Sequence, residues 1–185
     1  MIEELLQESE VRMRGTVKAL DDDLRVIRTG RASPALVERL EVDYYGIPTP
    51  LNQLATISVP EPRLLVIRPW DPSVLSDIER AILASDLGLT PNNDGRVIRL
   101  SIPRLTEERR RQLVRVVRSR VEEAKVAVRN IRRDALKDLR DFERESMISE
   151  DDFYRARDDL QELTDRFIDQ IDKMGQAKER EVMEV

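Results

Sequence analysis

The residues of this sequence best suited to act on another molecule are the lysines and arginines between residues 104 and 140. This segment holds thirteen of them against six acidic residues, a net charge of +7, whereas the whole 185-residue chain carries −5. At about 100° per helical residue, eight of these cations fall within one stripe roughly 100° wide. Such a stripe can bind phosphates, because each cation that neutralises a phosphate releases condensed counterions. The eight are Arg111, Arg115, Arg118, Lys125, Arg129, Arg132, Arg133 and Arg140.

The same stripe has a second interpretation, in which its arginines are solvated or pair with acidic residues on neighbouring helices. The other two long helical segments are both rich in acidic residues. Clustering on one stripe, interrupted only by Glu122 and Leu136, favours phosphate binding. The predominance of arginine over lysine suits bidentate phosphate contacts. Both interpretations stay open at this point.

The aromatic content indicates which kind of nucleic acid such a stripe would bind. The chain has three Phe, three Tyr and one Trp, mostly at apolar-pattern positions. Proteins that bind single-stranded nucleic acid need aromatic side chains on which the bases stack, and these residues do not provide them. No helix-turn-helix spacing is evident for reading DNA. Folded, double-stranded RNA contacted through its backbone is therefore the better match.

Other chemistries are excluded by residues that the chain lacks. It has no cysteine and no histidine, so it cannot form a thiolate–imidazole zinc site, a disulfide, a thiol nucleophile or a Ser–His–Asp triad. Neither G-x-x-x-x-G-K-[ST] nor G-x-G-x-x-G is present. We expect no enzyme, no metal, no cofactor and no small-molecule substrate. With no apolar run near ~18 residues and an acidic N-terminus, we also expect a soluble, cytoplasmic protein without a membrane partner.

Three long helical segments must position the cations. The first runs from Ile2 to about Arg28, with a heptad-like apolar seam. The second has Thr106 as its N-cap and runs to about Glu145, and the third opens on a capping-box-like sequence at Ser149. Each has one apolar stripe to bury, and three such helices pack most simply as a bundle.

A different pattern separates the first two helices. Strands are expected at 40–45, 54–59, 64–70 and 96–102, with a turn at 92–95. One helix is expected between them, with Asp71 as N-cap and Gly88 as terminator.

The sequence thus predicts an α+β protein of two domains, a long three-helix bundle (1–29 and 106–185) and an inserted small lobe (31–104). The chain passes between the domains twice, and two connections at one place make a natural hinge. The hinge residues are Thr29, Gly30, Arg31, Pro103, Arg104 and Leu105.

Seven segments spread over the whole chain resemble the ribosome recycling factor family. The resemblance runs end to end without a large gap, and its motifs are long. The segments are IRTGRASP (27–34), YYGIPTPLNQLA (44–55), ASDLGLTPNNDG (84–95), LTEERRRQLV (105–114), EEAKVAVRNIRRDA (122–135), ISEDD (148–152) and KEREVMEV (178–185).

The resemblance implies an L-shaped molecule with a three-helix bundle and an inserted β/α/β lobe. It implies that the chain, with elongation factor G and GTP hydrolysis by that partner, splits the post-termination ribosome into subunits and releases mRNA and tRNA. The bundle would lie across large-subunit ribosomal RNA, and we expect a monomer. The family's important arginine falls on Arg132. The further candidate rRNA-binding residues are Arg129, Arg133, Arg28, Arg31, Arg118, Lys125 and Arg111.

A rival interpretation belongs to another class of protein. The chain could be a non-ribosomal helical scaffold or chaperone-like interaction protein, whose seams bind protein partners and whose arginines only solvate the surface. A salt-sensitive complex with ribosomes would distinguish the first interpretation from this one.

Overall fold

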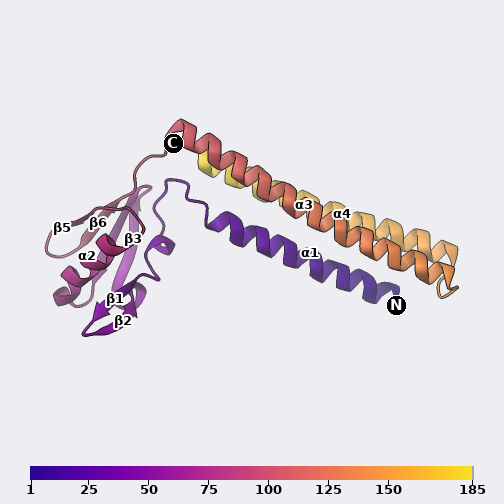
Figure 1. Cartoon of the computed structure of the whole chain (residues 1–185), viewed down its shortest axis with the longest axis horizontal. Helices are drawn as coiled ribbons and strands as arrows, with labels where there is room; N and C mark the ends of the chain where they lie inside the picture. Colours follow the sequence, from indigo (N-terminus) through magenta and orange to yellow (C-terminus); the bar gives the residue numbers. More distant parts are fainter. Residues whose placement is uncertain (185) are drawn as a thin grey trace. The chain divides into compact units, whose positions relative to one another are not determined.

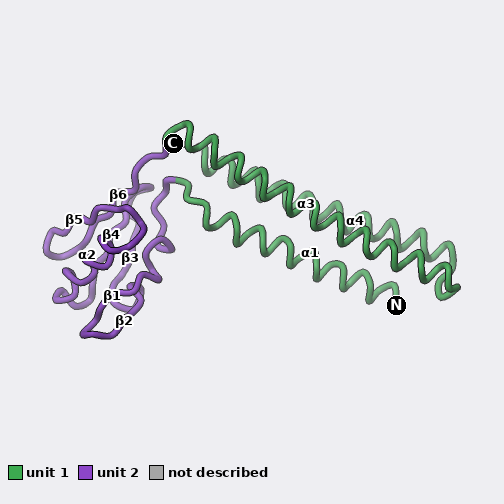
Figure 2. Tube along the Cα trace, in the orientation of Figure 1, with its two compact units in different colours: residues 1–29, 106–185 green, residues 30–105 purple. Residues whose placement is uncertain are grey.

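The computed structural model describes residues 1–184, and it divides the chain into two compact units. One unit contains residues 1–29 and 106–185, and the other contains residues 30–105 (Figure 2). Val185, the last residue of the expected bundle and of the closing motif, lies outside the described residues. No helix within 1–184 is both long enough and apolar enough to cross a membrane.

The first unit is a bundle of α1 (Ile2–Arg25), α3 (Glu107–Arg144) and α4 (Glu150–Met183) (Figure 1). The predicted caps are confirmed. The Thr106 hydroxyl accepts a hydrogen bond from the Arg109 amide at 3.1 Å, and Ser149 and Asp152 form a capping box. The first helix ends at Arg25, earlier than the predicted end near Arg28.

The three apolar seams meet in the core of the bundle. Buried side chains of α1, α3 and α4 form two clusters along its length. The buried polar groups of Ser9 and Thr164 donate hydrogen bonds to carbonyls of their own helices, at 2.8 Å to Leu5 and 2.7 Å to Leu160. Buried hydroxyls are thereby satisfied without a partner helix, and the core between the helices stays apolar.

The second unit contains two antiparallel sheets and one helix. A two-stranded sheet joins β1 (Glu41–Tyr44) to β2 (Ile47–Pro50). A four-stranded sheet has the order β3-β4-β6-β5, and α2 (Leu75–Ala84) contributes Ile78 and Ile82 to the same core. The strands of the larger sheet are β3 (Ala55–Glu61), β4 (Leu64–Pro69), β5 (Pro91–Asn93) and β6 (Ile98–Ser101).

The sequence did not predict one strand of each sheet, namely β2 and β5. Strand β2 contains two prolines, and β5 contains a proline followed by two asparagines, so neither has the composition of a strand. Both occupy positions with a free edge, where a missing N–H costs no ladder bond. The expected turn at 92–95 is wrong in its first half, because Asn92 and Asn93 pair with β6.

The helix of the second unit also differs in its limits. Asp71 accepts a hydrogen bond from the Ser73 amide at 3.0 Å, but it caps a short 3₁₀ helix, Pro72–Val74, that precedes α2. The helix ends at Ala84, four residues before Gly88, because Ser85 is extended and its hydroxyl donates to the Ile82 carbonyl at 2.6 Å.

Candidate nucleic-acid interface

The predicted cationic stripe lies on α3, next to the stripe of buried residues that runs from Leu113 to Leu139. Because the buried stripe fixes the rotation of α3 about its axis, each cation has a defined position around the helix. Their contacts divide the eight cations into two edges. The inner edge, facing α4, is Arg118, Lys125 and Arg132; the outer edge is Arg111, Arg115, Arg129, Arg133 and Arg140.

The inner-edge cations are seven residues apart and each contacts α4. Arg118 donates from Nε and Nη2 to the two carboxylate oxygens of Glu179, at 3.0 and 3.1 Å. The ammonium of Lys125 lies 2.5 Å from Oδ1 of Asp172. Arg132 donates from Nη1 to Oε1 of Gln161 at 2.7 Å. Two of the three cations therefore pair with a carboxylate, and the third bonds to a neutral amide.

Two inner-edge cations are thereby largely neutralised. The hydrogen bond to Asp172 raises the pKa of Lys125, whose side chain is only 15% exposed and also contacts Glu122. The hydrogen bond to Glu179 raises the pKa of Arg118. Lys125 must break two ion pairs to reach an external phosphate, so it acts mainly as a link between α3 and α4.

The outer edge has a different environment. Arg115, Arg129, Arg133 and Arg140 are exposed, and none makes an ion pair or hydrogen bond with any residue from 1 to 184. Arg111 pairs with Glu107 in its own helix. The four guanidinium groups without a partner keep all their donors available for an external acceptor.

Arg129, Arg132 and Arg133, which we call the basic cluster, form the most strongly positive part of the stripe. No carboxylate stands three or four residues from any of them on α3. Charges at these spacings are neighbours on a helix, so nothing on α3 offsets this cluster. The geometry suits multidentate contact with phosphate groups.

The remaining predicted residues lie near the two connections between the units. Arg28 is exposed beyond the end of α1, and the neighbouring Thr29 hydroxyl donates to Glu181 of α4 at 3.1 Å. Arg31 is exposed and belongs to the 30–105 unit, as do the hinge candidates at 30 and 103–105. Gly30 has φ +76°, and a Cβ there would lie 3.2 Å from Cγ of Leu105.

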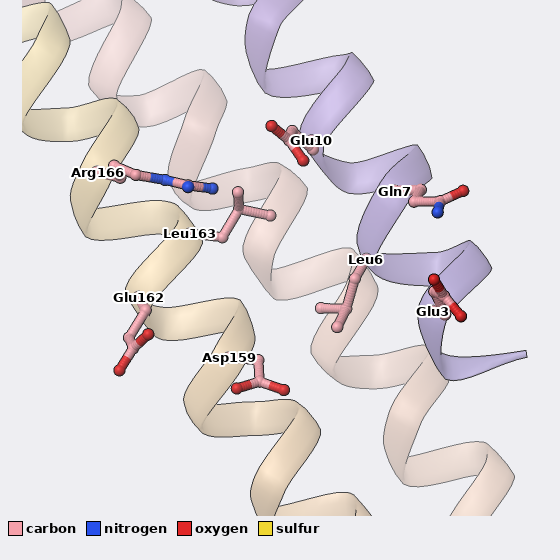
Figure 3. A pocket seen from close by; sticks show the side chains of 8 residues that line it. All are labelled: Glu3, Leu6, Gln7, Glu10, Asp159, Glu162, Leu163 and Arg166. Carbon is pink, nitrogen blue, oxygen red and sulfur yellow. The ribbon is translucent and has the colours of Figure 1, made fainter.

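The bundle also has a hollow of about 440 Å³ between α1 and α4 (Figure 3). Leu6 and Leu163 point into it, and its charged groups are four carboxylates and the guanidinium of Arg166. Phosphate would be repelled by this excess of negative charge. Among residues 1–184, no group of three or more acidic side chains is arranged to hold a metal ion.

The α4 partners of the inner edge, namely Gln161, Asp172 and Glu179, were not singled out from the sequence. Each is exposed or half-buried in a helix rich in charged and polar residues, so composition does not distinguish it. The only signal in the sequence is that Asp172 and Glu179 are seven residues apart, as are Arg118 and Lys125. This match can be recognised only once the antiparallel register of α3 and α4 is known.

The fold and the interface together define an α+β protein with a long three-helix bundle, an inserted lobe and a cationic face on one helix. The chain belongs to the ribosome recycling factor family, a family of translation factors, because the family model described as "Ribosome recycling factor" matches residues 20–183.

Full-length relatives support the same assignment. The chain is 60% identical over 185 residues to "Ribosome-recycling factor" of Roseiflexus sp. (strain RS-1), and 57% identical to that of Syntrophomonas wolfei subsp. wolfei (strain DSM 2245B / Goettingen); each alignment covers 100% of both chains. The family resemblance found in the sequence is confirmed.

Two solved structures resemble the whole chain. A solution structure of the ribosome recycling factor is 46% identical with a TM-score of 0.76, and the match covers 100% of this chain and 98% of that one. "Models for the T. thermophilus ribosome recycling factor and the E. coli elongation factor G bound to the E. coli post-termination complex" includes a chain that is 46% identical with a TM-score of 0.64, covered completely in both directions. The predicted α+β class, a helical bundle with a small inserted lobe, is confirmed.

Proposed function

We propose that this chain recycles ribosomes in the cytoplasm: with elongation factor G and GTP, it splits the post-termination ribosome into subunits and releases mRNA and tRNA. The observation that carries the proposal is end-to-end identity of 60% with a relative named for this activity. A second support is the similar structure of a recycling factor with elongation factor G on a post-termination complex. Hydrolysis of GTP belongs to the partner, so the chain needs no catalytic residue of its own.

The bundle docks on large-subunit ribosomal RNA through α3. The basic cluster carries most of this contact, because its three guanidinium groups face no carboxylate on their own helix. Arg28 and Arg31 add contacts near the connections. Arg111, Arg118 and Lys125 contribute less than their charge suggests, since each pairs with a carboxylate.

The lobe moves about the two connections when elongation factor G acts on it. Within the lobe, the Ala32 amide donates to the Pro62 carbonyl and the Ile102 amide to the Arg63 carbonyl, each at 2.8 Å. Both connections are therefore attached to the same β3–β4 turn, which lets the lobe respond as one body. Domains 1–29 with 106–185 and 31–104 thus have separate roles, docking and response to the partner.

The decisive experiment is a splitting assay. Purified chain, elongation factor G and GTP are added to post-termination complexes, and subunits are resolved by sedimentation. We expect 70S particles to convert to subunits only when all three are present. If the chain neither splits nor binds ribosomes at low salt, the proposal fails and the scaffold interpretation is favoured.

The contribution of Arg132 can be measured with one substitution. Arg132→Ala should weaken binding to the large subunit by about tenfold, the value of a charge-assisted hydrogen bond. The dependence of log K on log salt should become shallower by about one. The thermal midpoint should stay unchanged, because Arg132 bonds only to an exposed glutamine.

Arg120→Ala is the matched control, since Arg120 lies on the same helix but pairs with Glu123 at 3.1 Å, away from the stripe. It should bind as the unaltered chain does. Unchanged binding of Arg132→Ala together with a lower melting temperature would instead assign Arg132 a structural role.

A further inference from the structure

Helices α3 and α4 run antiparallel in a register that places a cation of α3 against a carboxylate of α4 every seven residues. Arg118 meets Glu179, and seven residues later on α3, Lys125 meets Asp172, seven residues earlier on α4. One further step of seven on each helix brings Arg132 opposite Asp165. The ladder therefore predicts a third ion pair between these two side chains.

The third ion pair is not made, and Gln161 instead forms a hydrogen bond with each of the two groups. Arg132 donates from Nη1 to Oε1 of Gln161 at 2.7 Å, and Nε2 of Gln161 donates to Oδ1 of Asp165 at 2.8 Å. Arg132 makes no ion pair with any residue that the structure describes. Since Gln161 and Asp165 are four residues apart on one helix face, their bond forms locally within α4.

The two kinds of partner have different consequences for an external anion. A carboxylate partner cancels the charge of its cation and must be displaced before a phosphate can bind, as at Lys125. A neutral amide holds the guanidinium in place through one hydrogen bond and leaves its charge and its remaining donors available.

We propose that Gln161 is a positioning residue, which holds Arg132 in a phosphate-binding orientation and keeps Asp165 from neutralising it. This inference rests on the proposed function, in which Arg132 contacts ribosomal RNA. It assigns α4 a part in RNA binding although the cations of the stripe belong to α3. Asp165 becomes an inhibitory carboxylate that is kept occupied by the amide of Gln161.

Three variants test the proposal: Gln161→Ala, Asp165→Asn and the double variant. Binding to isolated large subunits is measured across a salt series. Gln161→Ala should bind about two- to fivefold more weakly, the range that an exposed ion pair is worth, with a salt dependence shallower by up to about one. Asp165→Asn alone should bind as well as, or slightly better than, the unaltered chain.

The double variant is the critical one. Because it lacks the carboxylate that would capture Arg132, it should recover most of the binding and the salt dependence lost in Gln161→Ala. A merely structural role for Gln161 predicts no such recovery. Gln170→Ala, at an exposed and unpartnered glutamine of the described part of α4, is the matched control and should bind normally.

The outcomes separate this inference from the proposed function. If Arg132→Ala weakens binding but Gln161→Ala does not, the positioning role is overturned and RNA docking stands. The same conclusion follows if Gln161→Ala weakens binding and the double variant binds no better than Gln161→Ala. If neither the unaltered chain nor any variant binds the large subunit, both proposals fail together.

Discussion

Cations of α3 that are alike in being exposed still differ in what surrounds them. The side chain of Arg118 is 67% exposed, yet both of its hydrogen bonds go to the carboxylate of Glu179. Arg133 is also exposed and has no partner within residues 1–184. A guanidinium that is already paired offers a phosphate little net charge, so exposure alone is a poor guide to a nucleic-acid contact.

A second residue-scale effect concerns Asp94, in the turn between β5 and β6. It accepts hydrogen bonds from the amides of Val97 and Arg96, each at 2.9 Å, and pairs with Arg99 at 2.6 Å. These contacts hold the pKa of its carboxyl well below the usual range. A carboxyl whose pKa is lower in the folded state stabilises the fold above its unfolded pKa, and this contribution is lost as pH falls below about 4.

We therefore expect Asp94→Asn to lower the melting temperature of the 30–105 unit by a few degrees at pH 7 and by less at pH 3. Trp70, the only tryptophan of the chain, lies in this unit, so its fluorescence reports the transition. Asp86→Asn, at an exposed carboxylate of the same unit that makes no ion pair or hydrogen bond with any residue from 1 to 184, serves as the control. An equal decrease in melting temperature at pH 7 and pH 3 would show that the charge of Asp94 does not stabilise the turn.

The secondary-structure elements were predictable to the extent that local chemistry defines them. Thr106 and Ser149 mark helix starts because their hydroxyls cap backbone amides, a contact within four residues. Strands β2 and β5 were missed because their pairing partners, not their compositions, make them strands. Likewise, the α3 stripe followed from the helical period, whereas the bond between Arg132 and Gln161 depends on contacts between helices.

Close contact between α3 and α4 depends on Gly175. A Cβ at this position would lie 2.6 Å from Cγ2 of Val121, and β-branched side chains such as Val121 have little freedom to rotate away. Overpacking costs about 1–3 kcal/mol, against roughly 1 kcal/mol gained from replacing a helical glycine by alanine.

Gly175→Ala should thus destabilise the bundle by about 1 kcal/mol, measured by chemical denaturation. Combining it with Val121→Ala should cost less than the sum of the two single changes, because the smaller side chain makes room for the new methyl group. Strict additivity in this double-mutant cycle would show that the two residues do not press on each other.

At the scale of the whole molecule, each unit has its own apolar core and its own set of elements. The core of the bundle draws on α1, α3 and α4, and that of the lobe on its sheets and α2. The clustering of prolines between residues 34 and 103 marks the inserted segment in the sequence. The hinge remains a prediction, because a motion does not follow from the contacts within either unit.

Gly30 offers the most direct test of that hinge. Its φ of +76° costs an L-residue about 1–2 kcal/mol, and a Cβ there would press on Leu105 of the returning connection. Gly30→Ala should therefore disturb both connections at once while leaving α3 untouched. We expect ribosome splitting to slow severalfold, with binding to the large subunit unchanged.

Gly15→Ala is the matched control, because this helical glycine has no atom within 4 Å of an added Cβ. It should raise stability by about 0.5–1 kcal/mol and leave splitting at its normal rate. Parallel losses of binding and splitting in Gly30→Ala would point to a general folding defect. Normal splitting in Gly30→Ala would mean that this connection does not limit the motion, and the hinge would then have to be sought elsewhere in the chain.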